Sequence, residues 1–288
     1  MLKRKGPKEQ PPAPLAWDRK GNWWRVAVVA FLVLLSLFPL YFLVSTSLKT
    51  HGETLLAPLA PPMNGLHFEN WATVFPEVAR AMWNSTVICA ITTVLVVVFV
   101  TPAAYVFCWH RFPGKQFFYA WAVTMISMPA ILTFVPQFIL IKNLGLLNDR
   151  WGMILIYTAG GMAMSLMLLR SFLTSIPNEM IESARIDGAS ELRILAQIVA
   201  PLAGPSLITV AVMNFSGVWN AFMLPLLVLI DKAQYTLPLG VNDISTAYST
   251  DYARVLAYTT LSMIPALIFY AFAERQIIGG LTAGAVKE

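Results

Sequence analysis

Six long stretches of this 288-residue chain contain no Asp, Glu, Lys or Arg, and this distribution of charge constrains the fold most. A helix needs about 20 residues to cross the roughly 30 Å of hydrocarbon in a lipid bilayer. Composition agrees with membrane crossings, because only 12% of the residues are charged against about 25% in soluble domains. The stretches are 26–48, 81–110, 116–141, 151–169, 194–230 and 255–273.

The fifth stretch is too long for a single crossing, and Pro201, Gly204 and Pro205 interrupt it. We therefore place its span at about 206–230 and assign the residues before it to a loop. The prediction is an all-α membrane protein with six transmembrane helices. They cover 24–48 and, within a core of residues 81–275, about 81–109, 117–141, 151–170, 206–230 and 255–274.

Lys and Arg residues gather on one side of the predicted spans, which sets the orientation. The opposite side holds only Lys49, Arg80, Lys142, Arg150, Lys232 and Arg254. By the positive-inside rule, both termini are cytoplasmic. The net charge of +5 reflects this topology and does not indicate a nucleic-acid partner. The segments outside the spans are a disordered basic tail (1–23), a periplasmic loop (49–80), a cytoplasmic loop (171–205) and a cytoplasmic C-terminal tail (276–288).

The cytoplasmic loop carries the signals of two short helices joined by a turn, which we call the elbow. Pro177 suits a first helical turn and Gly188 suits a helix end, so the first helix is predicted from about Pro177 to Asp187. Ser190 with Glu191 can begin the second helix. The elbow could lie on the lipid headgroups, or it could be a docking surface for a partner.

Within the first helix of the elbow, Met180, Ile181 and Ala184 share an apolar side. Glu182 and Arg185 are spaced as an i, i+3 ion pair on another side. If the elbow docks on a partner, we expect the apolar side to enter a cleft of that partner. Glu182 and Asp187 are expected to fix the orientation through polar contacts, either within the loop or to the partner.

The elbow reads Glu182-Ser183-Ala184-Arg185-Ile186-Asp187-Gly188-Ala189, followed by Ile198, Pro201 and Pro205. This spacing resembles the EAA loop of ABC importer permeases, whose pattern is EAAxxDGAxxxxxFxxIxxPxxxP. Ser183 replaces the first Ala of the pattern and Leu195 replaces its Phe. The resemblance implies a type I ABC importer permease fold in which this loop couples the permease to an ATPase. The implied coupling residues are Met180, Ile181, Glu182, Ala184, Asp187, Gly188 and Ala189.

Further motifs resemble the carbohydrate-importing branch of this family, which includes the smaller permease subunit of maltose transporters. They are Asn70-Trp71, Asn84-Ser85, Leu144-Gly145-Leu146, Trp151-Gly152, Trp219-Asn220, Pro225-Leu226, Thr236-Leu237-Pro238 and the terminal segment 280–287. The resemblance implies a multi-pass protein of the bacterial inner membrane, surrounded by lipid. It also implies several protein partners: a second, different permease subunit, two ATPase subunits that hold ATP and Mg²⁺, and a soluble or lipid-anchored extracytoplasmic sugar-binding protein.

The same resemblance places the C-terminal tail at the interface of the two ATPase subunits, through Gly280, Leu281, Thr282 and Gly284. The glycines at 279, 280 and 284 favour a flexible segment over an extension of the last helix.

The chain itself has no GxxxxGK[ST] phosphate-binding loop, and the six charge-free stretches from which the spans are predicted offer no Asp or Glu for ion coupling. We therefore expect a transport subunit that is not an enzyme, binds no cofactor or metal, and relies on partner ATPases. An ion-coupled secondary transporter is the alternative within the transport class. An intramembrane enzyme is the other alternative, but His51, His67 and His110 are isolated and neither HExxH nor GxSxG occurs.

Polar residues inside the spans are candidates for a translocation path, because an unsatisfied amide in lipid is costly and tends to face other helices or water. The candidates are Gln137, Asn214, Trp219 and Asn220. For each of them, packing between helices is the competing interpretation. The sequence leaves a sugar, an oligosaccharide, a polyol and glycerol phosphate open as cargo.

Overall fold

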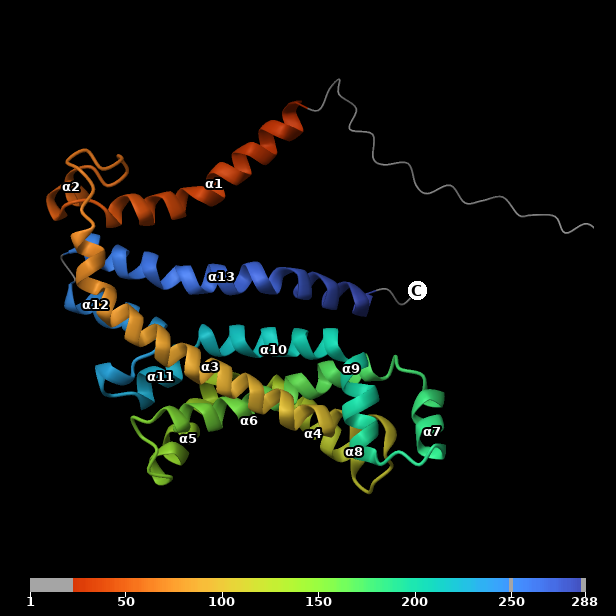
Figure 1. Ribbon diagram of the computed structural model, residues 1–288. Helices are drawn as coiled ribbons and strands as arrows, with labels where there is room; N and C mark the ends of the chain where they lie inside the picture. The colour runs from red at the N-terminus through yellow and green to blue at the C-terminus, as the bar shows by residue number, and fades with distance from the viewer. Residues whose placement is uncertain (1–22, 249–250, 286–288) are drawn as a thin grey trace, which may run out of the picture.

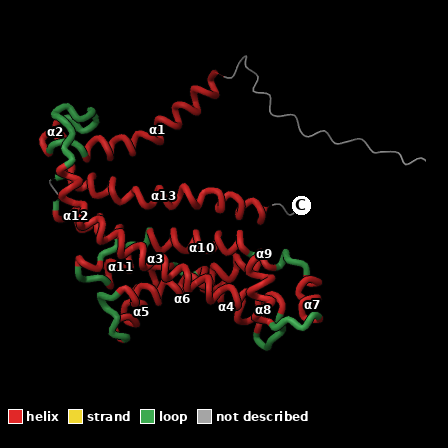
Figure 2. Tube along the Cα trace, viewed as in Figure 1, coloured by secondary structure: helices red, strands yellow, loops and turns green. Residues whose placement is uncertain are grey.

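Helices make up most of the structure, a computed structural model that describes residues 23–248 and 251–285 (Figures 1 and 2). No strand occurs in these two ranges, which confirms the predicted all-α fold class. The predicted N-terminal tail lies outside them, except for Trp23. The helices are α1 (Trp23–Ser47), α2 (His51–Leu56), α3 (Glu69–Trp109), α4 (Lys115–Ser127), α5 (Ala130–Asn143), α6 (Arg150–Leu173), α7 (Asn178–Ile186), α8 (Glu191–Ile194), α9 (Ala200–Leu202), α10 (Gly204–Trp219), α11 (Met223–Val228), α12 (Leu237–Ala247) and α13 (Tyr252–Ala285), with a π-helical segment at Leu195–Val199 and a 3₁₀ turn at Lys232–Gln234.

Four helices are long and apolar enough to cross a membrane, namely α1, α3, α6 and the part of α13 from Tyr252 to Phe269. Two bent pairs also qualify if each pair is counted as one span. They are α4 with α5, bent by 104°, and the run Glu191–Leu202 with α10, bent by 78°. The described part of the chain therefore offers four to six crossings, and the predicted six is the upper value.

The predicted span 117–141 is wrong as a continuous helix, because the chain breaks between α4 and α5. Met128 has a ψ of 127° and directly precedes Pro129. A proline disfavours helical backbone in the residue before it and has no N–H with which to continue a helix. The residues on both sides of the break are apolar, so the distribution of charge does not reveal it.

The predicted loop 49–80 is also partly wrong, because it contains α2 and the first turns of α3, which begins at Glu69. The start of α3 is held by the end of α1: Asn70 Nδ2 donates to the carbonyls of Ser47 and Lys49, at 3.0 and 2.9 Å. Trp71 Nε1 donates to Ser47 Oγ at 2.9 Å. Charged side chains end a charge-free run, but they do not end a helix.

Two further boundaries differ from the prediction. The span 206–230 is divided into α10 and α11, since the chain leaves the helix between Trp219 and Met223. Helix α13 continues to Ala285, so the expectation that the tail from Gly279 is not a helical extension is wrong up to that residue.

The long helices run between two ends of the molecule (Figure 1). The elbow, formed by α7 and α8, lies at one end, together with the C-terminal end of α13. We call this the elbow end. Helices α2, α11 and α12 and the connection from α5 to α6 lie at the opposite end. Between the ends, α3 packs along α6 and α10, while α1 and α13 lie side by side.

The opposite end is held together by side chains of the branch-specific motifs. Asn84 is fully buried, and its Nδ2 donates to the carbonyls of Ala233 and Tyr235 at 2.8 and 2.9 Å. Ser85 Oγ accepts a hydrogen bond from the backbone N–H of Leu237 at 2.8 Å. These bonds fix the loop before α12 against the middle of α3.

Candidate translocation cavity and coupling loop

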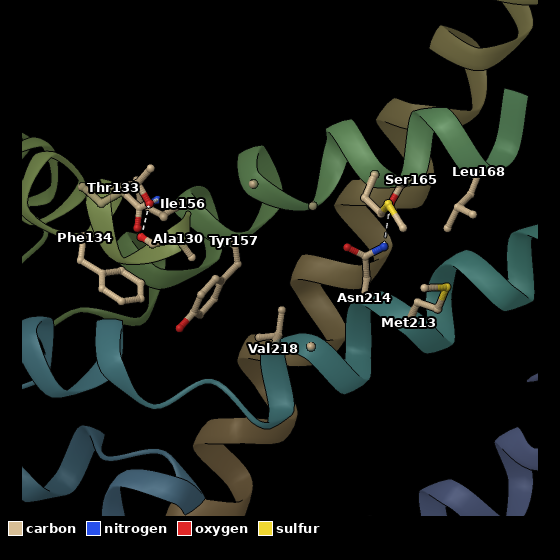
Figure 3. A pocket seen from close by; sticks show the side chains of 15 residues that line it. Ala130, Thr133, Phe134, Ile156, Tyr157, Ser165, Leu168, Met213, Asn214 and Val218 are labelled. Atoms are coloured by element: carbon tan, nitrogen blue, oxygen red, sulfur yellow. Dashed lines mark hydrogen bonds between the residues drawn. The ribbon is translucent and has the colours of Figure 1, made fainter. Parts of the chain in front are cut away.

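A cavity of about 340 Å³ lies between α5, α6 and α10 (Figure 3). Its polar lining consists of five side chains, and the remainder is apolar or glycine. Ala130, Phe134, Ile156, Met164, Leu168, Met213 and Val218 form most of the apolar wall. The polar members are Thr133, Gln137, Tyr157, Ser165 and Asn214.

The polar groups are held by hydrogen bonds within and between the helices. Gln137 Nε2 donates to Thr133 Oγ1 at 3.1 Å, and that hydroxyl donates to the carbonyl of Ala130 at 2.7 Å. On the facing helices, Asn214 Nδ2 donates to Ser165 Oγ at 2.7 Å, which joins α10 to α6 (Figure 3). Thus Gln137 and Asn214, predicted separately from sequence, line one cavity.

Tyr157 was not among the predicted path residues, although it projects from α6 beside the cavity (Figure 3). Its hydroxyl is buried and has no hydrogen-bond partner within residues 23–248 and 251–285. A buried unpaired hydroxyl is unfavourable and is available to a ligand or to water. A tyrosine in the middle of an otherwise apolar span is the sequence signal that could have identified it.

Trp219 and Asn220 do not line this cavity. They border a separate hollow of about 160 Å³ between α10 and α13. The ring of Trp219 stacks on Phe215 with centroids 5.5 Å apart, and Asn220 Nδ2 donates to the carbonyl of Ser216 at 2.8 Å. Both contacts lie within or at the end of one helix. Trp219 also belongs to a buried cluster with residues of α3, α12 and α13, so it fits the competing interpretation of packing between helices. The one hydrogen bond of the Asn220 side chain in the described structure is to α10.

At the elbow end, the predicted local structure is present. Helix α7 begins directly after Pro177 and ends at Ile186. Gly188 follows with a φ of +82°, in the left-handed region that glycine adopts without a steric penalty. Ser190 caps α8, because its side chain accepts a hydrogen bond from the backbone N–H of Arg193.

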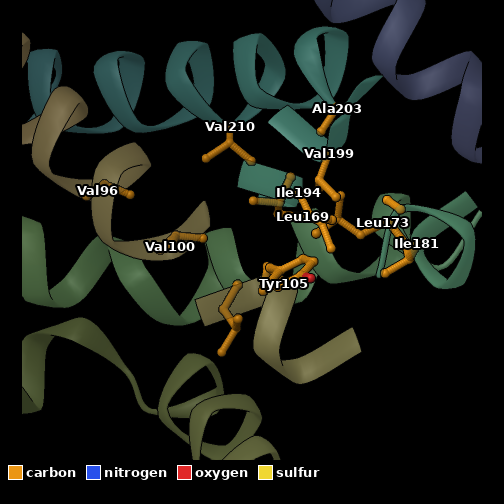
Figure 4. Packing of buried hydrophobic residues seen from close by; sticks show 13 residues of the cluster. Val96, Val100, Tyr105, Leu169, Leu173, Ile181, Ile194, Val199, Ala203 and Val210 are labelled. Atoms are coloured by element: carbon orange, nitrogen blue, oxygen red, sulfur yellow. The ribbon is translucent and has the colours of Figure 1, made fainter. Parts of the chain in front are cut away.

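The side of α7 that faces the protein differs from the expectation. Ile181 and Ala184 are buried in a core with residues of α3, α6 and α10 (Figure 4). They anchor α7 to its own chain, so the prediction that they supply an apolar face for a partner's cleft is wrong for these two. The exposed apolar residues of the elbow are Met180, Ile186 and Leu192, whose exposed fractions are 43%, 86% and 77%. The helical period shows which residues share a side, but not what that side faces.

The polar contacts of the elbow also differ from the prediction. Arg185 pairs with Glu191 of α8, its Nε lying 2.9 Å from Oε1, and not with Glu182. Glu182 and Asp187 are exposed, and neither side chain forms a hydrogen bond within the described ranges. Both are therefore free to contact a partner. Gly188 and Ala189 form the turn between the two helices.

No group of three or more His, Cys, Asp or Glu side chains able to hold a metal occurs in the part of the chain that the structure describes. The two candidate sites are an uncharged cavity between α5, α6 and α10 and a folded loop at one end. Together with the all-helical fold and its four to six candidate crossings, they define a polytopic membrane protein.

Comparison with known proteins identifies the family. The chain belongs to the binding-protein-dependent transport system inner membrane components, which match residues 101–277. It is a permease of the ABC importer class and a multi-pass protein of the inner membrane.

Several curated relatives match over most of their length. The diacetylchitobiose uptake system permease protein NgcG of Streptomyces coelicolor is 31% identical over 90% of this chain and 87% of its own. The arabinooligosaccharides transport system permease protein AraQ of Halalkalibacterium halodurans is 31% identical over 92% of this chain and 96% of its own. The trehalose transport system permease protein SugB of Mycobacterium tuberculosis is 30% identical over 93% of this chain and 98% of its own.

A solved structure has the same fold. It is a bacterial ABC transporter involved in the import of the acidic polysaccharide alginate, and one of its chains superposes with a TM-score of 0.77. The match covers 92% of this chain and 99% of that one at 22% identity.

Proposed function

We propose that this chain is the permease subunit of an ATP-driven importer for an uncharged carbohydrate, and that the cavity between α5, α6 and α10 forms part of the path. The observation that carries the proposal is the lining of that cavity. Five hydrogen-bonding side chains stand among apolar walls, and none of the lining residues, all of them in the described ranges, carries a formal charge.

This lining suits a sugar because a sugar presents both hydroxyl groups and apolar C–H faces. The amides of Gln137 and Asn214 offer donors and acceptors, and the hydroxyl of Tyr157 has no partner within the described chain. Phe134 and Met213 provide apolar contact. The volume falls at the low end of the range for small-molecule sites, about 300–1,000 Å³.

The absence of charge in the lining disfavours an anionic cargo. A buried carboxylate or phosphate without a paired cation loses several kcal/mol of solvation free energy. A neutral hydroxyl needs only a hydrogen bond. Glycerol phosphate and acidic sugars are therefore the less favoured of the cargo classes that the sequence leaves open. The names of the relatives agree, since diacetylchitobiose, arabinooligosaccharides and trehalose are uncharged carbohydrates.

Transport would proceed by alternating access, driven by two partner ATPase subunits that bind ATP and Mg²⁺. The exposed residues of the elbow, with Glu182, Asp187 and the Gly188 turn, would dock on these subunits, and the C-terminal tail would reach their interface. A second, different permease subunit would complete the path. Helix α1 supports this arrangement, because none of its most apolar window is buried within the described chain. An extracytoplasmic binding protein would deliver the sugar at the opposite end.

The proposal is tested on the assembled transporter with its binding protein in proteoliposomes. ATP-dependent uptake is measured for trehalose, diacetylchitobiose and arabinobiose, and for the anionic probes digalacturonate and glycerol 3-phosphate. We expect uptake of at least one neutral probe and of neither anionic probe. Uptake of an anionic probe alone would contradict the proposal.

The cavity is tested with Gln137→Leu and Tyr157→Phe, using Gln116→Leu as a matched control. Gln116 is exposed at the start of α4 and lies outside the cavity. Loss of one hydrogen bond to a neutral partner is worth about 1 kcal/mol, or roughly fivefold in an equilibrium constant. We expect each cavity variant to lower uptake about fivefold, with unchanged uptake in the control. Equal uptake in all three variants would exclude the cavity from the path.

A further inference from the structure

A second feature of the elbow end, distinct from the docking residues, is a carboxylate shared by three structural elements. Glu191 is the first residue of α8. Its Oε1 accepts from Arg185 Nε of α7 at 2.9 Å, and its Oε2 accepts from Arg185 Nη2 at 3.2 Å. Oε2 also accepts the hydroxyl hydrogen of Tyr105 in α3 and lies 3.3 Å from Nε2 of His110, at the end of α3.

The Arg185–Glu191 pair bridges the turn at Gly188. Side-chain packing does not hold this turn, because no atom lies within 4 Å of the position that a Cβ of residue 188 would occupy. Glycine also adopts a φ of +82° without steric cost, so the turn can bend easily. A two-pronged guanidinium–carboxylate pair has a defined geometry and resists bending. Glu191 therefore holds α7 and α8 at a fixed angle across a turn that would otherwise be flexible.

Tyr105 connects this pair to the membrane helices. It is 3% exposed and packs in the same core as Ile181, Ile194 and Val210, so its ring is fixed (Figure 4). Its hydroxyl donates to Glu191 Oε2. A second bond runs in parallel, from Trp109 Nε1 to Asn178 Oδ1 at 2.9 Å. The end of α3 thus contacts both helices of the elbow.

The route from α8 leads to the cavity. After α8, the chain passes through the π-helical segment Leu195–Val199 and α9 into α10, which carries Asn214. The bend between the run Glu191–Leu202 and α10 is 78°. Segments of π-helix are found at functional sites within helices. The chain therefore connects α8 to α10, and the hydrogen bond from Tyr105 connects α8 to α3.

The surroundings of Glu191 keep it ionised. Hydrogen bonds from Arg185 and then from Tyr105 lower the pKa of its carboxyl group below the ordinary value. The Arg185–Glu191 pair is partly exposed, so it contributes little to the free energy of unfolding. Its role is to fix the angle between α7 and α8.

We infer that Glu191 is a positioning residue that joins α7, α8 and α3 into one rigid body, so that motion imposed on the elbow by an ATPase moves α10 and α3 and does not bend the turn at Gly188. The inference rests on the proposed function. Without the contacts of Glu191 with Arg185 and Tyr105, an ATPase could still bind the exposed residues of α7 and hydrolyse ATP. Less of the motion of the ATPase would then reach the cavity.

The test uses the assembled transporter in proteoliposomes and the neutral probe with the highest wild-type uptake. The ratio of sugar transported to ATP hydrolysed is measured for Glu191→Gln, Arg185→Gln and the double variant, together with ATPase pull-down. We expect Glu191→Gln to lower the ratio at least threefold with ATPase binding retained. The double variant should be no worse than Glu191→Gln, because residues that act through one contact are not additive.

Tyr105→Phe removes only the hydroxyl that donates to Glu191 and preserves the ring. It should therefore lower the ratio of sugar transported to ATP hydrolysed, but less than Glu191→Gln does. It also provides the test if Glu191→Gln fails to assemble. Glu69→Gln is the control for the loss of a carboxylate, since Glu69 is exposed at the start of α3, far from the elbow, and its side chain forms no hydrogen bond in the described ranges. A wild-type ratio in Tyr105→Phe, or additive losses in the double variant, would overturn the inference. Absence of ATP-dependent uptake in the wild type would instead contradict the proposed function.

Discussion

Gly161 of α6 and Asn214 of α10 lie so close together that a Cβ atom on Gly161 would be 2.3 Å from Asn214 Oδ1. Asn214 cannot easily move away, because its Nδ2 is bonded to Ser165 Oγ and to the carbonyl of Val210. The absence of a side chain at 161 therefore permits the approach of α6 and α10 at one wall of the cavity.

We expect Gly161→Ala to destabilise the permease by about 1–3 kcal/mol, the usual cost of forcing an extra methyl group into a packed contact. Thermal unfolding of the purified complex in detergent measures this. Gly160→Ala is the matched control, because no atom lies within 4 Å of its Cβ position. In the Asn214→Ala background, Gly161→Ala should lower the melting temperature less than in the wild type, because the oxygen that the methyl group would meet is absent, while sugar uptake stays low. Equal melting temperatures for the two single glycine variants would show that the contact relaxes.

A second prediction concerns Asn84, which secures the loop before α12. Asn84→Ala leaves the carbonyls of Ala233 and Tyr235 without their donor, and leaving such groups unpaired costs about 1–3 kcal/mol. We expect a lower melting temperature of the complex, with membrane insertion intact. Thr86→Val is the control, since the exposed hydroxyl of Thr86 is bonded only to the carbonyl of Met82 in its own helix. An equal melting temperature in the two variants would argue against a role for Asn84 in holding this end together.

Orientation in the membrane gives a third prediction. The connection from α5 to α6, which contains Leu147, and helix α12, which contains Asn242, lie at the end opposite to Ser190 (Figure 1). Given the positive-inside rule, alkaline phosphatase fused at Leu147 or Asn242 should be active in the periplasm. A fusion at Ser190 should remain in the cytoplasm and be inactive. Phosphatase activity at Ser190 would contradict both the orientation and the contact of the elbow with an ATPase.

Local features of the chain could be predicted from sequence because they depend on neighbouring residues. The cap at Ser190 and the left-handed turn at Gly188 are set by side-chain chemistry and backbone freedom within a few positions. The break before Pro129 is equally local. The predicted span 117–141 ran across it, because a charge-free run measures length and polarity and not continuity of the helix.

The cavity could be predicted only in part, because it exists where three separate helices meet. Gln137 and Asn214 were identified from the cost of placing amides in lipid, but Tyr157 has too apolar a body to be detected in that way. The burial of Ile181 depends on the core built by α3, α6 and α10. A periodic pattern on α7 contains no information about that core. The pairing of Arg185 with Glu191 in place of Glu182 has the same origin, since it requires the fold of the turn between α7 and α8.

The turn at Gly188 allows the conformational and the steric costs of a substitution to be separated. Its φ is +82°, and no atom lies within 4 Å of the Cβ position. The penalty for adding a Cβ atom at 188 therefore comes from the left-handed backbone and not from a steric contact. That penalty is about 1–2 kcal/mol for most residues, higher for β-branched ones, and smallest for asparagine.

We therefore predict that transport decreases in the order Gly188→Asn, Gly188→Ala, Gly188→Val, while all three variants insert in the membrane. Valine should shift the turn away from the left-handed region and change the angle between α7 and α8, so that the elbow no longer fits the ATPase. Sugar uptake, ATP hydrolysis and ATPase pull-down are measured on the same preparations. The asparagine variant is the control for the presence of a side chain, because it adds bulk but keeps the backbone conformation accessible. Wild-type uptake and normal ATPase binding by Gly188→Val would show that the geometry of this turn does not control coupling.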